Sequence, residues 1–309
     1  RQRQMCIRDR VSFMLSACNF YMPIFEEALD AYGLPLELKY LPIIESALNP
    51  SAVSRAGASG WWQFMIGTGK IYGLESNSLV DERRDPIKAT WAAARYLKEM
   101  YAIYGDWNLV IAAYNCGPGT INKAIRRANG ETDYWKIYNL LPKETRGYVP
   151  AFIAANYVMT YYCDHNICPM ETNIPASTDT VQVNKNLHFE QIADLCNVPL
   201  DQIKSLNPQY KKQVIPSDSK PYTLRLPIEA ISNFIDKQDT IYAHRSNELF
   251  RNRKTVAVKE NTPSTRKATT AVAGKGKLSY YAIKCGDTLS TIAGKYGVSV
   301  KDIQRWNGM

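Results

Sequence analysis

The sequence lacks the features that define several classes of protein. No apolar run approaches the roughly 18 residues that a membrane-spanning helix requires, so no segment is predicted to cross a bilayer. The chain has three histidines and no H-E-x-x-H motif, and its seven cysteines form no C-x-x-C pair. Such spacings are typical of zinc sites and disulfide frameworks. We therefore expect no metal site and no cofactor, and we expect free thiols, although Cys163 and Cys168 are close enough in sequence to form a bridge.

Net positive charge is also small outside one segment. The formal net charge is +9, but residues 245–277 contain nine Lys/Arg and two Glu, a net of +7, which leaves +2 for the rest. Basic segments often contact nucleic acid or an anionic surface. This one has few aromatic residues and no nucleic-acid motif. We expect no nucleic-acid binding and favour attraction to an acidic polymer of the cell envelope.

Helical patterns dominate the first half of the chain, whose 309 residues are enough for two or more domains. Residues 85–105 have Asp85 as N-cap, Pro86 at the first helical position, apolar residues three or four apart, and Gly105 as the stop. Short Gly/Pro connections separate the helices, which indicates a compact, mainly α domain. Further helices are predicted over 107–115, over 120–130 with Thr120 as its cap, and over 146–162, bent or begun at Pro150.

An internal repeat follows this domain. Residues 181–208 show a short strand and two short helices, and 222–227 read as another strand. The same order recurs over 281–308 at an offset of 100 without gaps, and the coincident apolar positions indicate two copies of one βααβ unit. The second copy stops before its closing strand, which suggests C-terminal truncation. Identical pairs are Ile192/Ile292, Ala193/Ala293, Val198/Val298, Ile203/Ile303 and Asn207/Asn307.

One carboxylate lies beside an apolar run, in LPIIESALNP (41–50). Cleavage of a glycosidic bond needs an acid that protonates the leaving oxygen at neutral pH, and burial among apolar groups raises the pKa of a glutamate toward that range. Glu45 has such neighbours. The local sequence alone leaves two alternatives open, a solvated helix position or a buried acid.

Residues 35–74, PLELKYLPIIESALNPSAVSRAGASGWWQFMIGTGKIYGL, resemble the catalytic core of lytic transglycosylases with the soluble-transglycosylase, goose-lysozyme-like fold. The nearest group is the membrane-bound lytic transglycosylase D type. The resemblance covers about residues 20–160, with Trp61 in place of the usual leucine and Cys116 in place of a common alanine. Its four ordered motifs are Glu45-Ser46, Gly60-Trp61-Trp62-Gln63, Ala113-Tyr114-Asn115-Cys116-Gly117, and LPKETRGYVP (141–150) with Tyr148.

The resemblance implies roles for these residues. Glu45 is the expected catalytic acid and base. Gln63, Tyr114 and Asn115 are expected to line the cleft and to bond sugar or the glutamate. Ser46 and Tyr148 are expected either to support these groups from behind or to position the substrate. Plain core packing is the alternative for the two tyrosines, while Trp62 suits either the core or a sugar-stacking platform.

A second catalytic carboxylate is missing from these motifs, although most glycosidases use a pair. The nearest acidic cluster, Asp81, Glu82 and Asp85, better suits a helix cap with local arginine pairs. One acid suffices if the N-acetyl group of the substrate stabilises the developing cation and its C6 hydroxyl attacks. The product is then a 1,6-anhydro sugar, and the enzyme is a lyase.

The second repeat, with its G-D-T-L-S-x-I-A run and terminal W-N, resembles a LysM module, a family that binds N-acetylglucosamine-containing glycans. Gly286, Asp287, Thr288 and Leu289 occupy the loop and helix start that the family uses for sugar contact. The first repeat has Asn186-Leu187-His188 at the matching positions. It resembles a degenerate LysM module, for which glycan binding and a structural role are equally open.

Together these patterns predict a mainly α lysozyme-like catalytic domain with small α+β (βααβ) LysM modules. We expect a monomeric peptidoglycan lytic transglycosylase of the bacterial periplasm or cell envelope, with outer-membrane association left open. It would cleave the MurNAc-β-1,4-GlcNAc bond of glycan strands and form 1,6-anhydro-MurNAc ends. The alternatives are a goose-type muramidase and a non-catalytic peptidoglycan-binding scaffold. The expected segments are a non-native leader (1–10), the catalytic domain (11–170), a degenerate LysM-like module (178–228), a basic flexible linker (229–277) and a truncated LysM module (278–309).

Overall fold

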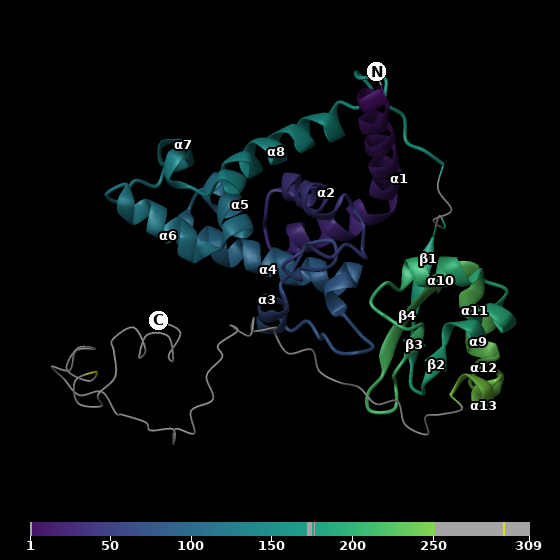
Figure 1. Cartoon of the computed structure of the whole chain (residues 1–309). Coiled ribbons are helices and arrows are strands. Elements are labelled where there is room, and N and C mark those ends of the chain that lie inside the picture. Colours follow the sequence, from purple (N-terminus) through teal and green to yellow (C-terminus); the bar gives the residue numbers. More distant parts are fainter. Residues whose placement is uncertain (1, 172–174, 176, 251–292, 294–309) are drawn as a thin grey trace. The chain divides into compact units, whose positions relative to one another are not determined.

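The computed structural model describes residues 2–171, 175, 177–250 and 293, and those up to 250 belong to one compact unit. Its first part is a bundle of helices (Figure 1). In the described part of the chain, no helix is both long and apolar enough to cross a membrane. The helices are α1 (Gln2–Ala31), α2 (Leu41–Ser46), α3 (Ile66–Ile71), α4 (Pro86–Tyr104), α5 (Trp107–Cys116), α6 (Pro118–Arg127), α7 (Tyr134–Ile137) and α8 (Lys143–Thr160), with short 3₁₀ turns η1 (Leu36–Tyr40), η2 (Glu82–Arg84) and η3 (Tyr138–Leu140).

Capping chemistry fixes the ends of the central helix α4. The side chain of Asp85 accepts hydrogen bonds from the backbone N–H groups of Ile87 and Lys88, and Pro86 needs no partner at the first helical position. Gly105 ends the helix with a φ of 63°, a left-handed conformation that favours glycine. Both predicted ends are confirmed.

Two predicted helix starts are wrong. The helix α6 begins at Pro118 after Gly117, whose φ of 81° allows the turn. Thr120 therefore lies inside the first turn, and its hydroxyl donates to the carbonyl oxygen of Cys116 at 2.8 Å instead of capping. The helix α8 begins at Lys143 and runs through Pro150, so the predicted start was too late.

The helices share one apolar core. The helix α1 packs along α4, and α5 contacts α4, α6 and α8. Both tryptophans of the Gly60–Gln63 motif are fully buried in this core, and their ring N–H groups donate to the Arg84 carbonyl oxygen and to the hydroxyl of Thr90. Trp62 is therefore a core residue and not a sugar-stacking platform. Other fully buried members include Phe25, Leu29, Leu41, Leu97, Leu109, Val110 and Val149.

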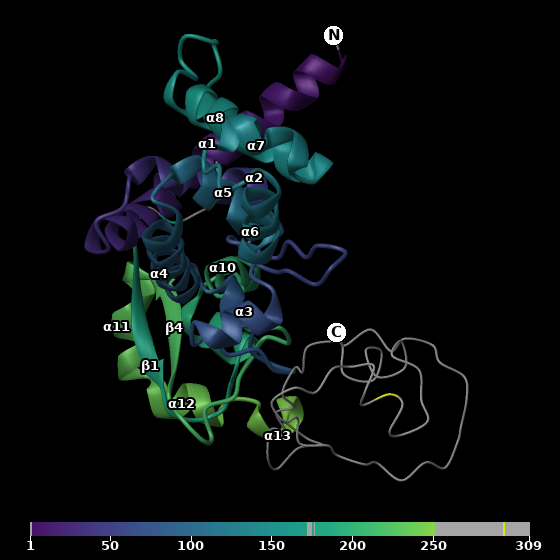
Figure 2. The ribbon, with the colours of Figure 1, turned by 90° about the vertical axis from the view of Figure 1, so that its left-hand side faces the viewer.

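The second part of the unit is a small α+β module. Its strands are β1 (Thr178–Val183), β2 (Leu187–His188), β3 (Val214–Ile215) and β4 (Tyr222–Pro227), and its first helices are α9 (Phe189–Cys196) and α10 (Leu200–Leu206). The strands β1 and β4 pair antiparallel, with Val181 opposite Leu224, and lie side by side in Figures 1 and 2. A short β2–β3 pair accompanies them. The βααβ order predicted from the repeat is confirmed for this copy.

The start of the predicted flexible linker is helical and packed on the module, so that prediction is wrong for residues 229–250. Three helices occupy it, α11 (Ile228–Asp236), α12 (Gln238–Ala243) and α13 (Ser246–Leu249). Phe234 and Ile241 are fully buried in the module core. The helices α11 and α12 are too short to show a clear helical pattern of apolar residues, and the basic, Thr-rich stretch that follows dominates the composition of this region.

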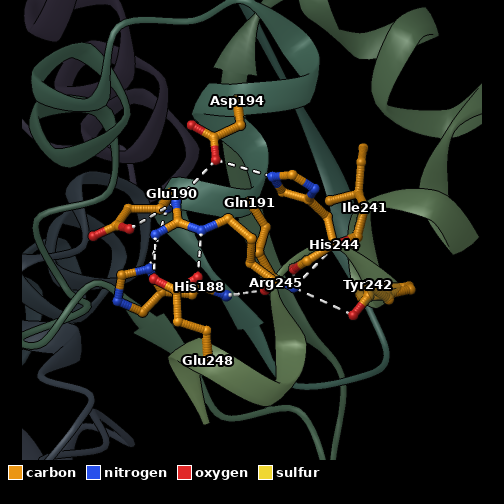
Figure 3. A network of polar contacts seen from close by, with 9 residues as sticks. All are labelled: His188, Glu190, Gln191, Asp194, Ile241, Tyr242, His244, Arg245 and Glu248. Carbon is orange, nitrogen blue, oxygen red and sulfur yellow. Dashed lines mark hydrogen bonds and ion pairs between the residues drawn. The ribbon is translucent and has the colours of Figure 1, made fainter. Parts of the chain in front are cut away.

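Polar contacts also attach these helices to α9 (Figure 3). The buried Gln191 side-chain amide donates to three carbonyl oxygens at the end of α12, that of His244 at 2.7 Å. The His244 ring nitrogen lies 3.0 Å from Asp194, and the Arg245 guanidinium contacts Asp194 at 3.0 Å and Glu190 at 3.2 Å. The chain therefore stays folded through residue 249.

The predicted fold class, a mainly α domain with a small α+β module, is confirmed. Apart from residue 293, the second LysM repeat lies outside the described residues, and so do Gly286, Asp287, Thr288 and Leu289 and most of the basic segment. Cys163 and Cys168 are free and exposed, so the bridge considered for them is not formed.

Candidate active site

The short helix α2 presents Glu45 in its last turn. Leu41, Pro42 and Ile43 are buried, so the apolar run faces the core. The helix ends at Ala47 and Leu48, which have φ values of 51° and 58°. These left-handed conformations are uncommon for residues other than glycine. Glu45 itself is half-buried at the edge of the core.

A tyrosine 103 residues away in sequence contacts the Glu45 carboxyl group. The hydroxyl of Tyr148, on α8, donates a hydrogen bond to Oε1 of Glu45. Burial raises the pKa of Tyr148 well above its ordinary value, and the nearby Glu45 charge raises it further. Tyr148 therefore remains a neutral donor at neutral pH.

Burial raises the pKa of Glu45 from 4.5 to about 7. Removal from water disfavours the charged carboxylate and is the largest cause. The Tyr148 hydrogen bond acts in the opposite direction, and the negative charge of Glu144 adds to the increase. Both protonation states of Glu45 are therefore populated near neutral pH, which is the condition for a group that must both give and take a proton.

Tyr114 and Asn115 lie at the end of α5. Tyr114 is adjacent to Glu45, and Asn115 contacts α8. The Tyr114 hydroxyl donates to the carbonyl oxygen of Trp62 at 2.7 Å. Its pKa is raised well above the ordinary value by burial and by the adjacent Glu45. The Asn115 side-chain oxygen accepts from the Thr145 hydroxyl at 2.9 Å. These bonds connect α5 to the turn that contains Trp61 and Trp62 and to α8.

Ser46 and Gln63 hydrogen-bond to the backbone of the turn that contains Trp61 and Trp62. The buried Ser46 hydroxyl lies 2.9 Å from the carbonyl oxygen of Pro42 and 3.0 Å from that of Trp61. These two contacts join the end of α2 to the turn that contains the tryptophans. Gln63 has a φ of 47°, and its amide donates to the carbonyl oxygen of Gly60 at 2.8 Å. This bond closes the turn that carries the two tryptophans.

The structure thus brings Glu45, Tyr148 and Tyr114 together, with Asn115 nearby. The sequence motifs assigned no role to Glu144, although it contributes to the Glu45 pKa. Its spacing from Tyr148 could have indicated this, since residues four apart share one face of a helix. Glu144 is exposed at the start of α8.

Comparison with known proteins gives three matching domain families. Residues 22–137 match the Transglycosylase SLT domain. Residues 177–243 match the LysM-like domain of lytic transglycosylase MltD, and residues 281–309 match the LysM domain. The middle match includes α11 and α12, in agreement with their packing on the module.

Two curated relatives with similar sequences are named lytic murein transglycosylases. Membrane-bound lytic murein transglycosylase D of Escherichia coli (strain K12) is 31% identical over 279 residues, which are 89% of this chain and 57% of that protein. Soluble lytic murein transglycosylase of the same strain is 32% identical over 124 residues, 38% of this chain and 19% of that protein. The crystal structure of the 70 kDa soluble lytic transglycosylase from Escherichia coli aligns with a TM-score of 0.40 and 29% identity, over 46% of this chain and 24% of that one.

Residues 22–137 therefore match a transglycosylase SLT domain, and two matches of the LysM type follow along the chain. The resemblance derived from the sequence motifs is confirmed, and the chain is related to the membrane-bound lytic transglycosylases of the D type. The chain spans 57% of the length of the D-type relative.

Proposed function

We propose that this protein is a peptidoglycan lytic transglycosylase that cleaves the β-1,4 bond between N-acetylmuramic acid and N-acetylglucosamine. The observation that carries the proposal is the setting of Glu45, a half-buried carboxyl group with a pKa of about 7 and a tyrosine donor on one oxygen. A carboxyl group in such a setting is suited to general acid catalysis at neutral pH.

Glu45 acts first as an acid. Its proton passes to the glycosidic oxygen while the bond from that oxygen to C1 of the muramic acid breaks. The 2-acetamido oxygen of the substrate stabilises the positive charge that develops at C1. Tyr148 holds one carboxyl oxygen, so that the other oxygen can carry the proton toward the substrate.

Glu45 then acts as a base. The carboxylate takes the proton from the C6 hydroxyl of the muramic acid as O6 forms a bond to C1. One C–O bond breaks and another forms, the proton lost by Glu45 is replaced, and no water is consumed. A single carboxyl group therefore completes the cycle, because the substrate supplies the nucleophile that a second carboxylate or an activated water supplies in other glycosidases.

The neighbouring polar residues bind substrate in this proposal. Tyr114, Asn115 and Gln63 line the cleft around the bond, and Tyr148 orients Glu45. Ser46 contributes indirectly, since its hydroxyl contacts the carbonyl oxygen of Trp61.

The remaining parts of the chain fit a wall-bound enzyme. The LysM domain at 281–309 would hold it on glycan strands through Gly286, Asp287, Thr288 and Leu289, and the basic segment would add attraction to acidic wall polymer. A peptidoglycan substrate places the protein in the periplasm or cell envelope. We propose that it acts there as a monomer.

The mass of the muropeptides released from purified sacculi tests the reaction. The proposal predicts 1,6-anhydro ends, each lighter by one water than a reducing end. Reducing ends would instead identify a muramidase that hydrolyses the same bond.

A pair of glutamate variants tests the catalytic role. Glu45→Gln is expected to abolish release, while Glu37→Gln, at an exposed glutamate in the preceding turn η1, is expected to leave it unchanged. Unchanged release by Glu45→Gln would mean that Glu45 is not the acid, and no release by the wild type would favour a peptidoglycan-binding scaffold.

A further inference from the structure

The LysM-like module is joined to the catalytic domain by more than the chain between them. Residues 75–85 of the catalytic domain form a backbone bridge with the module. The N–H of Asp81 donates to the carbonyl oxygen of Gln209, and the N–H of Lys211 donates to that of Leu79, both at 2.8 Å. Val80 and Tyr210 are the antiparallel pair between these bonds.

Two apolar side chains of this segment complete the core of the module. Leu79 is 1% exposed and Val80 is fully buried, and both belong to the same core cluster as Phe189 and Leu224. The module therefore cannot separate from the catalytic domain without exposing both side chains to water.

Polar contacts surround this apolar contact. The Lys211 ammonium donates to the carbonyl oxygen of Asn77 at 2.8 Å and lies 3.5 Å from the Asp81 carboxylate. The Tyr222 hydroxyl lies 3.0 Å from the Glu75 carboxylate. Burial alone would raise the pKa of Asp81, but hydrogen bonds from Arg83 and the charges of Arg83 and Lys211 hold it below its ordinary value. Asp81 is thus a buried carboxylate shared by an arginine of one domain and a lysine of the other.

Arg83 connects Asp81 to a loop of the catalytic domain, residues 57–64. Its guanidinium makes two 2.8 Å bonds to the Asp81 carboxylate, and the two side chains are 5% and 2% exposed. The same guanidinium donates at 2.9 Å to the carbonyl oxygens of Gly57 and Phe64. It thereby holds both ends of the 57–64 loop.

The centre of that loop lies against the backbone of Arg83. A Cβ on Gly60 would lie 1.8 Å from the Arg83 carbonyl oxygen, and the φ of Gly60 is 85°. Within the loop, the carbonyl oxygen of Trp61 contacts the Ser46 hydroxyl, and that of Trp62 accepts from Tyr114. Ser46 is the chain neighbour of Glu45, so the loop fixes the groups on which the position of Glu45 depends.

We propose that Arg83 is a positioning residue of the catalytic site and that the docked LysM-like module holds it in place through Lys211 and Asp81. This rests on the proposed function. In this account the module is a structural part of the active site, which answers the question left open by its degenerate sequence.

Two substitutions in the full chain test the proposal. Arg83→Lys removes the fork that joins Asp81 to both ends of the loop, because an ammonium cannot reproduce the planar donor set. We expect kcat to fall by about tenfold to a hundredfold with little change in KM, the loss that misplacement of a catalytic group by about 1 Å produces. Lys211→Met removes the positive charge that the module places beside Asp81. It is expected to lower kcat too, by a smaller factor than Arg83→Lys.

The pH profile separates positioning from mere folding. Glu45 faces Tyr148 and Glu144 of α8 and Tyr114 of α5. A loosened loop admits water to Glu45, and the alkaline limb of kcat/KM should therefore move to lower pH in both variants. Lys211→Arg keeps the charge and should restore the wild-type profile. The matched control Lys185→Met lies on the same module but pairs with Asp239 of α12, and it should change neither kcat nor the limb.

Circular dichroism and thermal unfolding measure the folded fraction of each variant. If kcat falls only in proportion to that fraction while the limb stays fixed, the role is structural and the proposal fails. It also fails if Arg83→Lys and Lys211→Met are fully folded and keep both the wild-type kcat and the wild-type alkaline limb of kcat/KM. A wild-type protein that releases no anhydro products would contradict the proposed function itself, a result distinct from either of these.

Discussion

Replacement of Tyr148 by phenylalanine isolates the hydrogen bond that the structure shows on Glu45. The phenol donates to Oε1 and favours the charged carboxylate, so it lowers the Glu45 pKa against the larger effect of burial. Without the hydroxyl, burial and the Glu144 charge act unopposed. The pKa of Glu45 in Tyr148→Phe should therefore lie above the wild-type value of about 7.

The size of this increase follows from the energy of the bond. A hydrogen bond to a charged group contributes about 1.5–3 kcal/mol, and one pKa unit corresponds to about 1.4 kcal/mol. A donor that served only the carboxylate would thus be worth about one to two units. Since the hydroxyl also contacts the protonated carboxyl group, we expect an increase of about one unit.

The pH dependence of kcat/KM for muropeptide release measures this change, because activity falls at high pH as the acid loses its proton. The alkaline limb of Tyr148→Phe should move up by about one pH unit. Tyr157→Phe is the matched control, since Tyr157 lies on the same helix with its side chain 53% exposed. A limb that stays in place, or moves to lower pH, would refute the account of how Glu45 is tuned.

Four further predictions follow from other features. Glu45 has a pKa of 4.5 unfolded and about 7 folded, so the unfolded chain binds fewer protons between these values and stability falls as pH rises through them. Glu45→Gln should therefore be more stable than the wild type at pH 8 by up to about 3 kcal/mol, seen as a higher unfolding temperature, and equal stability at both pH 4 and pH 8 would contradict this. Gly60→Ala should cost more than about 3 kcal/mol in urea unfolding, while Gly57→Ala, with open space around its Cβ, should cost about 1–2 kcal/mol; equal costs would refute the contact. Phe234→Ala should destabilise the module by about 3–5 kcal/mol, and no loss would mean that α11 is not packed. Deletion of 278–309 should weaken sedimentation with sacculi but spare cleavage of soluble glycan, and unchanged binding would contradict the LysM assignment.

Local chemistry made the helix ends predictable where one residue decides them. Asp85 and Gly105 gave both ends of α4 because an N-cap carboxylate and a left-handed glycine act within one turn. Thr120 was misjudged because Gly117 and Pro118 already start α6, which leaves the threonine inside the helix.

The packing of residues 228–243 on the module could not be derived from the same patterns. The helices α11 and α12 are short, and Phe234 and Ile241 are recognisable as core only once β1, β4 and α9 supply the surface that they cover. The basic residues that follow dominated the composition and favoured a linker.

The contacts of the candidate active site could also be predicted only in part from the sequence. The ordered motifs identified Glu45, Tyr114 and Tyr148, but the pKa of Glu45 depends on burial and on a partner 103 residues away. The Asp81–Arg83 pair was predicted as local charge pairing. Its contacts with Gly57 and Phe64 depend on tertiary structure and have no signal in the sequence.

The central claim is that Glu45 works alone, with the C6 hydroxyl of the substrate as nucleophile. Digestion of sacculi in heavy-oxygen water, followed by mass spectrometry of the released muropeptides, tests it most directly. The account predicts muramic acid ends without the heavy isotope, because water takes no part in the reaction. Heavy oxygen at C1 of the released muramic acid would contradict the account and would show that Glu45 activates water instead.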